Sequence, residues 1–138
     1  MKKLLALLLA GCMAFALCAC GTPAEPADDG GDAAATGDTI VIGVYEPLSG
    51  DNGAGGKQET LGVQYANSVQ PTVEIGGKTY NVVVKYVDNE SSNDKVPSAA
   101  SKLVGDGVSV VLGSYGSGVS IAASDIFKEG GIPAIGVT

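Results

Sequence analysis

The segment from Gly113 to Gly118 (GSYGSG) has the clearest potential for ligand chemistry in this sequence. It follows an apolar run and precedes a segment with helical spacing, so Ser117 falls at a predicted helix N-terminus. The first N–H groups of a helix are unpaired and carry partial positive charge, and together they hold a carboxylate well. Ser117 either donates its hydroxyl to such an anion or caps its own helix. Tyr115 either lines the same pocket or packs within the loop.

A second glycine-dense segment, Glu46–Gly56, follows another apolar run. Either Ser49 and Gly50 approach a ligand with bare backbone, or the glycines only supply the positive φ of a tight turn. The Gly-Lys pair at the end of the segment resembles the end of a phosphate-binding loop. That loop needs glycine five residues before the pair and Ser or Thr directly after it. These positions hold Asp51 and Gln58, so we reject a nucleotide site.

Composition excludes several other kinds of site. The sequence has no histidine, arginine or tryptophan, and its three cysteines all lie in the first 20 residues, at Cys12, Cys18 and Cys20. Without histidine no Ser-His-Asp triad can form, and the usual ligands of zinc and copper are missing. A chain of net charge −7 without arginine is a poor partner for a phosphate backbone. We therefore expect no enzyme active site, no metal or other cofactor, and no nucleic acid partner.

The N-terminus has the pattern of an export signal. A short basic start precedes an apolar run that is marginal for spanning a bilayer, which predicts a lipoprotein signal peptide at residues 1–19. Cys20 is the expected lipidation site; Cys12 fits the short lipobox motif better but leaves little apolar sequence before it. Residues 20–38 then form a lipidated, flexible acidic linker. We expect the protein to be anchored by lipid on the extracytoplasmic face of the cell membrane.

Apolar runs and glycine-rich breaks alternate along residues 39–138. They predict strands and helices, with Asp94 as the cap of the second helix and Gly76-Gly77 as a hairpin turn. Asp88 and Glu90, at the end of the third strand, form either an acid pair or a solvated turn. The strands are expected at 39–45, 72–75, 78–87, 108–112 and 132–137, and the helices at 57–68, 94–104 and 117–129. This alternation predicts an α/β fold, a parallel sheet flanked by helices whose ligands bind outside the carboxyl ends of the strands.

The joint order of several segments resembles one family. Pro47-Leu48-Ser49-Gly50, Val110–Gly118 and Gly131–Ile135 follow one another as in the N-terminal third of the solute-binding proteins of branched-chain amino acid ABC transporters. The resemblance implies the type I periplasmic-binding-protein fold, in which two lobes close on an amino acid. It makes residues 39–138 the N-terminal part of lobe I, with the second lobe absent.

The resemblance also implies site residues. Ser117 takes the position of the serine that holds the ligand carboxylate. The other expected cleft residues are Tyr115, Gly116, Ser49, Gly50 and Gly55. The best-known members of the family carry a tyrosine where this sequence has Gly55, a departure that bears on the preferred ligand side chain.

The implied function is the extracytoplasmic solute-binding component of an ABC importer. Such a protein delivers a branched-chain or similar small amino acid, or an amide, to a membrane permease, and we expect a monomer. Two alternatives remain open at this point: a ligand-sensing or surface-interaction lipoprotein of the same fold without transport, and an exported α/β enzyme truncated before its catalytic residues. Because the second lobe is absent, we expect this chain alone to bind ligand weakly or not at all.

Overall fold

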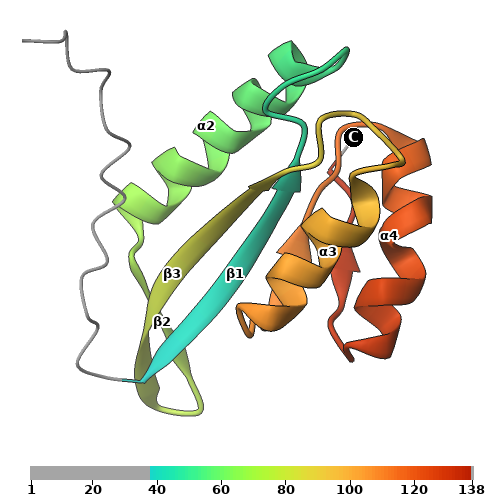
Figure 1. The fold of residues 1–138 in the computed structure, drawn as a ribbon. Coiled ribbons are helices and arrows are strands. Elements are labelled where there is room, and N and C mark those ends of the chain that lie inside the picture. Colours follow the sequence, from blue (N-terminus) through green and yellow to red (C-terminus); the bar gives the residue numbers. More distant parts are fainter. Residues whose placement is uncertain (1–37, 138) are drawn as a thin grey trace, which may run out of the picture. The chain divides into compact units, whose positions relative to one another are not determined.

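The computed structural model describes residues 38–137 of the 138-residue chain (Figure 1). The predicted signal peptide, both candidate lipidation sites, Cys20 and Cys12, and all but the last residue of the predicted acidic linker lie outside the described residues. Within the described part, no helix has the length and apolar character needed to cross a membrane.

One sheet with strand order β2-β3-β1-β4-β5 organises the described residues. Strands β1, β3, β4 and β5 run parallel to one another, and β2 pairs antiparallel with β3. This confirms the predicted α/β class and a mostly parallel sheet flanked by helices. The elements are β1 (Thr39–Glu46), α2 (Gly53–Val69), β2 (Thr72–Ile75), β3 (Lys78–Asp88), α3 (Val96–Gly105), β4 (Val110–Leu112), α4 (Ser117–Glu129) and β5 (Ala134–Ile135).

The predicted hairpin between β2 and β3 is confirmed. Gly76 and Gly77 connect the two strands with φ values of 61° and 78°. Two successive residues with positive φ form the kind of tight turn whose twist suits paired strands, and glycine adopts it without steric cost.

Two predicted helix starts are wrong. Helix α2 begins at Gly53 instead of residue 57, within a segment expected to be loop. Its first turn packs on Pro47, where a Cβ at Gly56 would clash with the backbone oxygen, so close packing outweighs the low helix propensity of glycine. Asp94 does not cap α3: the N-cap is Lys95, without a side-chain cap bond. Successive backbone turns at Ser92 and Lys95 set that start instead.

Strand β1 sends alternate side chains to opposite faces of the sheet. Val41 and Tyr45 face helices α3 and α4, which lie together on one side (Figure 1). The ring of Tyr45 meets that of Phe127 edge to face, with centroids 5.6 Å apart. The core on this side comprises Tyr45, Val87, Val96, Ala99, Ala100, Leu103, Val108, Val111, Val119, Ala123 and Phe127.

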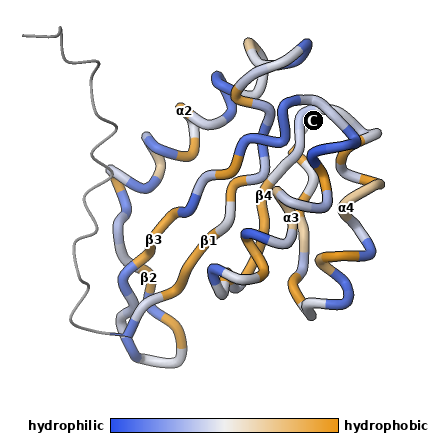
Figure 2. The backbone as a smooth tube through the Cα atoms, in the orientation of Figure 1, coloured by the Kyte–Doolittle hydropathy of each residue, from blue (hydrophilic) through white to orange (hydrophobic). Residues whose placement is uncertain are grey.

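Of the described elements, only α2 covers the opposite face. A cavity of about 530 Å³ lies between this helix and the strands. The strands themselves are largely hydrophobic (Figure 2). Its apolar lining includes Ile42, Val44, Val63, Val82, Val84 and Leu112. Leu61, Tyr65 and Val69 recur at helical spacing on α2, but they are exposed and do not cover the sheet. The described fold therefore has one closely packed face and one open face.

Candidate functional site

The carboxyl ends of β1, β3 and β4 meet at one edge of the sheet, because these strands are parallel neighbours. The segments that leave them, residues 47–52, 89–95 and 113–116, lie together at this edge (Figure 1). Every predicted cleft residue comes from one of these segments or from the first turn of the helix that follows it. We call this set of three segments the rim.

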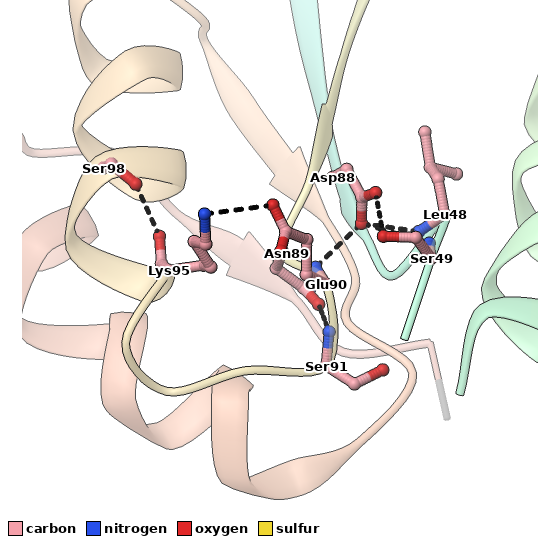
Figure 3. A network of polar contacts seen from close by, with 8 residues as sticks. All are labelled: Leu48, Ser49, Asp88, Asn89, Glu90, Ser91, Lys95 and Ser98. Atoms are coloured by element: carbon pink, nitrogen blue, oxygen red, sulfur yellow. Dashed lines mark hydrogen bonds and ion pairs between the residues drawn. The ribbon is translucent and has the colours of Figure 1, made fainter. Parts of the chain in front are cut away.

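Asp88 joins the first two rim segments (Figure 3). Its carboxylate accepts the N–H of Leu48 at 2.8 Å, the hydroxyl of Ser49 at 2.6 Å and the N–H of Glu90 at 2.7 Å. A longer bond of 3.3 Å from the N–H of Ser49 completes the set. Burial alone would raise the pKa of Asp88, but the hydrogen bonds outweigh it and lower the pKa below its ordinary value.

The two alternatives for Asp88 and Glu90 can now be weighed. Glu90 pairs with Lys95 at 3.4 Å, and both side chains are about half exposed. Asp88 instead bonds to backbone N–H groups and to Ser49, so the two acids form a structured turn and not an acid pair. The Ser49 hydroxyl is committed to this turn.

Gly50 makes the second contact between the same segments. It has a φ of 74°, and a Cβ there would clash with the backbone oxygen of Glu90. Next to it, the N–H of Asn52 donates to the hydroxyl of Ser91 at 3.0 Å. The glycine therefore serves a tight turn and a close approach of two loops, which favours the second of the two predicted roles for the Ser49–Gly50 segment.

Tyr115 and Gly55 are brought together, although 60 residues separate them in the sequence. A Cβ at Gly55 would lie 2.9 Å from Cζ of the Tyr115 ring, so the ring occupies the space beside the bare backbone of α2. Tyr115 is 39% exposed, which leaves part of the ring open at the rim. The Tyr115 ring, which comes from the third rim segment, thus provides an aromatic surface beside Gly55.

Glu46, which the sequence analysis did not single out, holds the third segment from beneath. Its side chain is 1% exposed, and Oε2 accepts the N–H of Tyr115 at 2.7 Å. Burial raises the pKa of Glu46 to about 7; the Tyr115 N–H opposes the shift, whereas the charge of Glu59 and a hydrogen bond with it add to it. Gly113, with a φ of 116°, leaves room for this carboxyl group.

Asn89 and Ser114 are further residues that the sequence did not reveal. Both are fully buried, and the Asn89 side-chain amide donates to the Ser114 hydroxyl at 2.8 Å. The N–H of Asn89 also donates to the backbone oxygen of Glu46. These bonds fasten the end of β3 to the ends of β1 and β4. An apolar run ending in polar residues was the only local signal for them.

Ser117 is the first residue of α4, and Gly116 is the N-cap with a φ of 114°. Because Gly116 and not Ser117 occupies the N-cap position, Ser117 does not cap its own helix. Its side chain is exposed and its hydroxyl has no hydrogen-bond partner within residues 38–137. A Cβ at Gly116 would lie 3.5 Å from Nδ2 of Asn52, which sets the start of α4 beside the segment after β1. The first N–H groups of α4 are therefore available at the rim, together with a free hydroxyl.

Comparison with known proteins identifies the family. The sequence model of the periplasmic binding protein family matches residues 39–138. A Leu/Ile/Val-binding protein homolog of Brucella abortus is 38% identical over 93 residues, which are 67% of this chain and 25% of that protein. The Leu/Ile/Val-binding protein BraC3 of Rhizobium johnstonii is 37% identical over 94 residues, with the same coverage. The chain spans about a quarter of the length of the curated relatives it matches.

Solved structures agree with this. A leucine-binding protein of Thermotoga maritima superposes with a TM-score of 0.64 at 26% identity, over 71% of this chain and 27% of that one. A branched-chain amino acid transporter substrate-binding protein of Streptococcus pneumoniae, in complex with isoleucine, gives 0.63 at 30%, over 72% and 28%. An ABC transporter solute-binding protein of R. palustris, in complex with benzoate, gives 0.60 at 30%, over 71% and 27%. The chain thus has part of a type I periplasmic-binding-protein fold, and it belongs to the periplasmic binding protein family of ABC-transporter solute-binding proteins.

Proposed function

We propose that this chain contributes the first part of a ligand-binding lobe to an extracytoplasmic solute-binding protein of an ABC importer. In this proposal the start of α4 binds the carboxylate of a branched-chain or similar small amino acid. One observation carries it: the Ser117 hydroxyl has no partner within the described residues and stands at the N-terminus of α4, beside the rim segment that follows β1. The family consists of solute-binding proteins, which supports a role without catalysis.

The ligands named for two structural relatives support the same chemistry. Isoleucine and benzoate share a carboxylate attached to an apolar body. The carboxylate suits the N–H groups and hydroxyl at Ser117. The exposed part of the Tyr115 ring, beside Gly55, is the apolar surface that would meet the ligand side chain. Gly116, which has no side chain, would let the ligand approach the backbone between the contacts at Ser117 and Tyr115.

The remaining elements of the proposal concern the surroundings of the protein. Residues 1–19 would act as a signal peptide, residues 20–38 as a lipidated linker, and residues 39–138 as part of lobe I. Cys20, or alternatively Cys12, would carry the lipid that holds the protein on the extracytoplasmic face of the membrane. The partner would be the permease of the importer, approached by a monomer.

The carboxylate site is tested by NMR titration of the ¹⁵N-labelled chain with leucine, isoleucine and valine. We expect weak binding whose amide shifts concentrate at Gly116–Val119. Isopentylamine, which is leucine without its carboxylate, should leave these amides unchanged. Ser117→Ala should weaken leucine binding by about tenfold, because a hydrogen bond to a charged group is lost.

Ser124→Ala is the matched control. Ser124 lies in the same helix, and its exposed hydroxyl bonds only to the backbone oxygen of Ile121, so leucine binding should not change. Leucine shifts that avoid the start of α4, or an unchanged affinity in Ser117→Ala, would contradict the proposal. Sub-micromolar binding by calorimetry would contradict the expectation that this chain alone binds weakly.

A further inference from the structure

Two carboxyl groups lie at one end of the cavity beneath the rim. Glu46 comes from the last position of β1, and Glu59 from the second turn of α2. Both line the cavity, whose walls are otherwise mostly apolar. Glu46 is 1% exposed, so its carboxyl group is removed from water. A buried carboxylate without a partner is costly, and two adjacent carboxylates are costlier still.

If both carboxyl groups are ionised, two of their buried oxygens have no hydrogen-bond donor. Glu46 Oε2 accepts the N–H of Tyr115, but Glu46 Oε1 and Glu59 Oε2 are buried without any donor. Ionised carboxylates only accept hydrogen bonds, so neither group can satisfy the other. One proton on either group supplies the missing donor and removes one of the two charges.

Within residues 38–137, no neighbouring group donates a hydrogen bond to Glu46 Oε1 or Glu59 Oε2. Helix α2 contributes Glu59, which acts on Glu46 through its charge and a hydrogen bond. Strand β3 contributes Asp88, the register partner of Glu46, whose carboxylate bonds to Leu48, Ser49 and Glu90 instead. The third rim segment contributes Tyr115, through its backbone N–H. On β1 itself, the neighbouring Tyr45 side chain faces the opposite side of the sheet.

We propose that Glu46 and Glu59 share one proton near neutral pH, and that the protonated pair positions Tyr115 and the segment leading to Ser117. Loss of the proton leaves two negative charges that repel each other, one of them on the buried side chain of Glu46, so Glu46 moves toward water and releases the Tyr115 N–H. The rim segment then loosens as pH rises. The effect on ligand binding rests on the proposed function, whereas the shared proton does not.

The direction of the pH effect follows from linkage. Burial raises the pKa of Glu46 to about 7 from an ordinary value of 4.5. The folded chain therefore holds a proton that the unfolded chain has already released between these two values. Stability contributed by the protonated pair is complete below pH 4.5, decreases as pH rises, and is lost above about 7.

The test is a pH titration of the ¹³C,¹⁵N-labelled chain by NMR, without ligand, over the range from acidic to alkaline pH. We expect the side-chain carboxyl carbon of Glu46 to show a midpoint near 7, and the signals of the Glu59 side chain and of the Tyr115 amide proton to shift with it. The carboxyl carbon of exposed Glu129 serves as the internal reference. An ordinary midpoint for Glu46, or a Glu59 side chain whose signals do not respond when Glu46 titrates, would overturn the proposal.

Variants separate positioning from a merely structural role. Glu46→Gln retains an oxygen for the Tyr115 N–H and gives Glu59 a permanent donor, so the Tyr115 amide should no longer respond near neutral pH. Glu129→Gln should leave the titration unchanged. A Tyr115 shift that persists in Glu46→Gln would overturn the proposal. If this variant does not fold, the wild-type titration decides alone, and because it needs no ligand, its result is independent of the leucine titration.

Discussion

The two faces of the sheet carry similar apolar residues but differ in how they are covered. On the α3–α4 face, Tyr45 and Leu103 are fully buried; on α2, which covers the other face, Leu61 and Tyr65 are 62% and 72% exposed. The strands cannot explain the difference, because β1 and β3 supply valines to both faces. The difference lies in the helices: two pack together on one face, and a single helix stands over a cavity on the other. The stability of the described fold therefore depends mainly on the α3–α4 face.

The rim is held largely independently of the open face. Its bonds run between the three segments, through Asp88, Asn89 and the Tyr115 N–H. Glu46, which lines the cavity, also accepts the Tyr115 N–H and so connects the cavity to the rim. The rim can therefore keep its geometry although the space between α2 and the sheet is not filled by side chains.

The largest expected effect is on the packed face. Leu103→Ala removes a fully buried side chain from the core and should lower the free energy of unfolding by about 2–5 kcal/mol. Leu61→Ala, the same change on α2, removes an exposed side chain and should alter it by less than about 0.5 kcal/mol. Urea denaturation of both variants measures the difference. Equal losses would show that the two faces contribute alike.

The middle-sized effect concerns the bonds that join the rim segments. Asp88→Ala removes the acceptor for the N–H groups of Leu48 and Glu90 and for the Ser49 hydroxyl. Because the site is partly exposed, we expect a loss of about 1–2 kcal/mol. Asp125→Ala, an exposed acid on α4, should have almost no effect and serves as the control.

The pH dependence of the stability lost in Asp88→Ala provides a sharper test. The pKa of Asp88 is lowered in the folded state, so its contribution is present above the ordinary value of 3.8 and is lost as pH falls through the folded pKa. The difference between wild type and Asp88→Ala, measured by urea denaturation, should therefore shrink in strong acid. A difference that is constant with pH would mean that packing, and not the carboxylate, accounts for it.

The sequence predicted those elements whose signals are local. Helix α4 has the predicted bounds, since an apolar strand, a glycine-rich break and Gly130-Gly131 all mark it. The Gly76-Gly77 hairpin was equally clear. The missed residues, such as Asn89 and Glu46, are buried polar groups whose partners lie 25 and 69 residues away. Their roles depend on which loops meet at the rim, and no spacing within one segment encodes that.

The smallest expected effect is a gain on the open face. Gly62 lies within α2 and lines the cavity, and a Cβ there would meet nothing within 4 Å. Gly62→Ala should therefore raise the free energy of unfolding by about 0.5–1 kcal/mol, because alanine favours the helix and restricts the unfolded chain. Gly56→Ala, in the same helix, should instead destabilise the fold, because its Cβ would clash with Pro47. Urea denaturation measures both variants. If the free energy of unfolding rises in Gly62→Ala and falls in Gly56→Ala, close packing of α2 ends between these two glycines. A fall in both variants would mean that α2 lies against the sheet along its length.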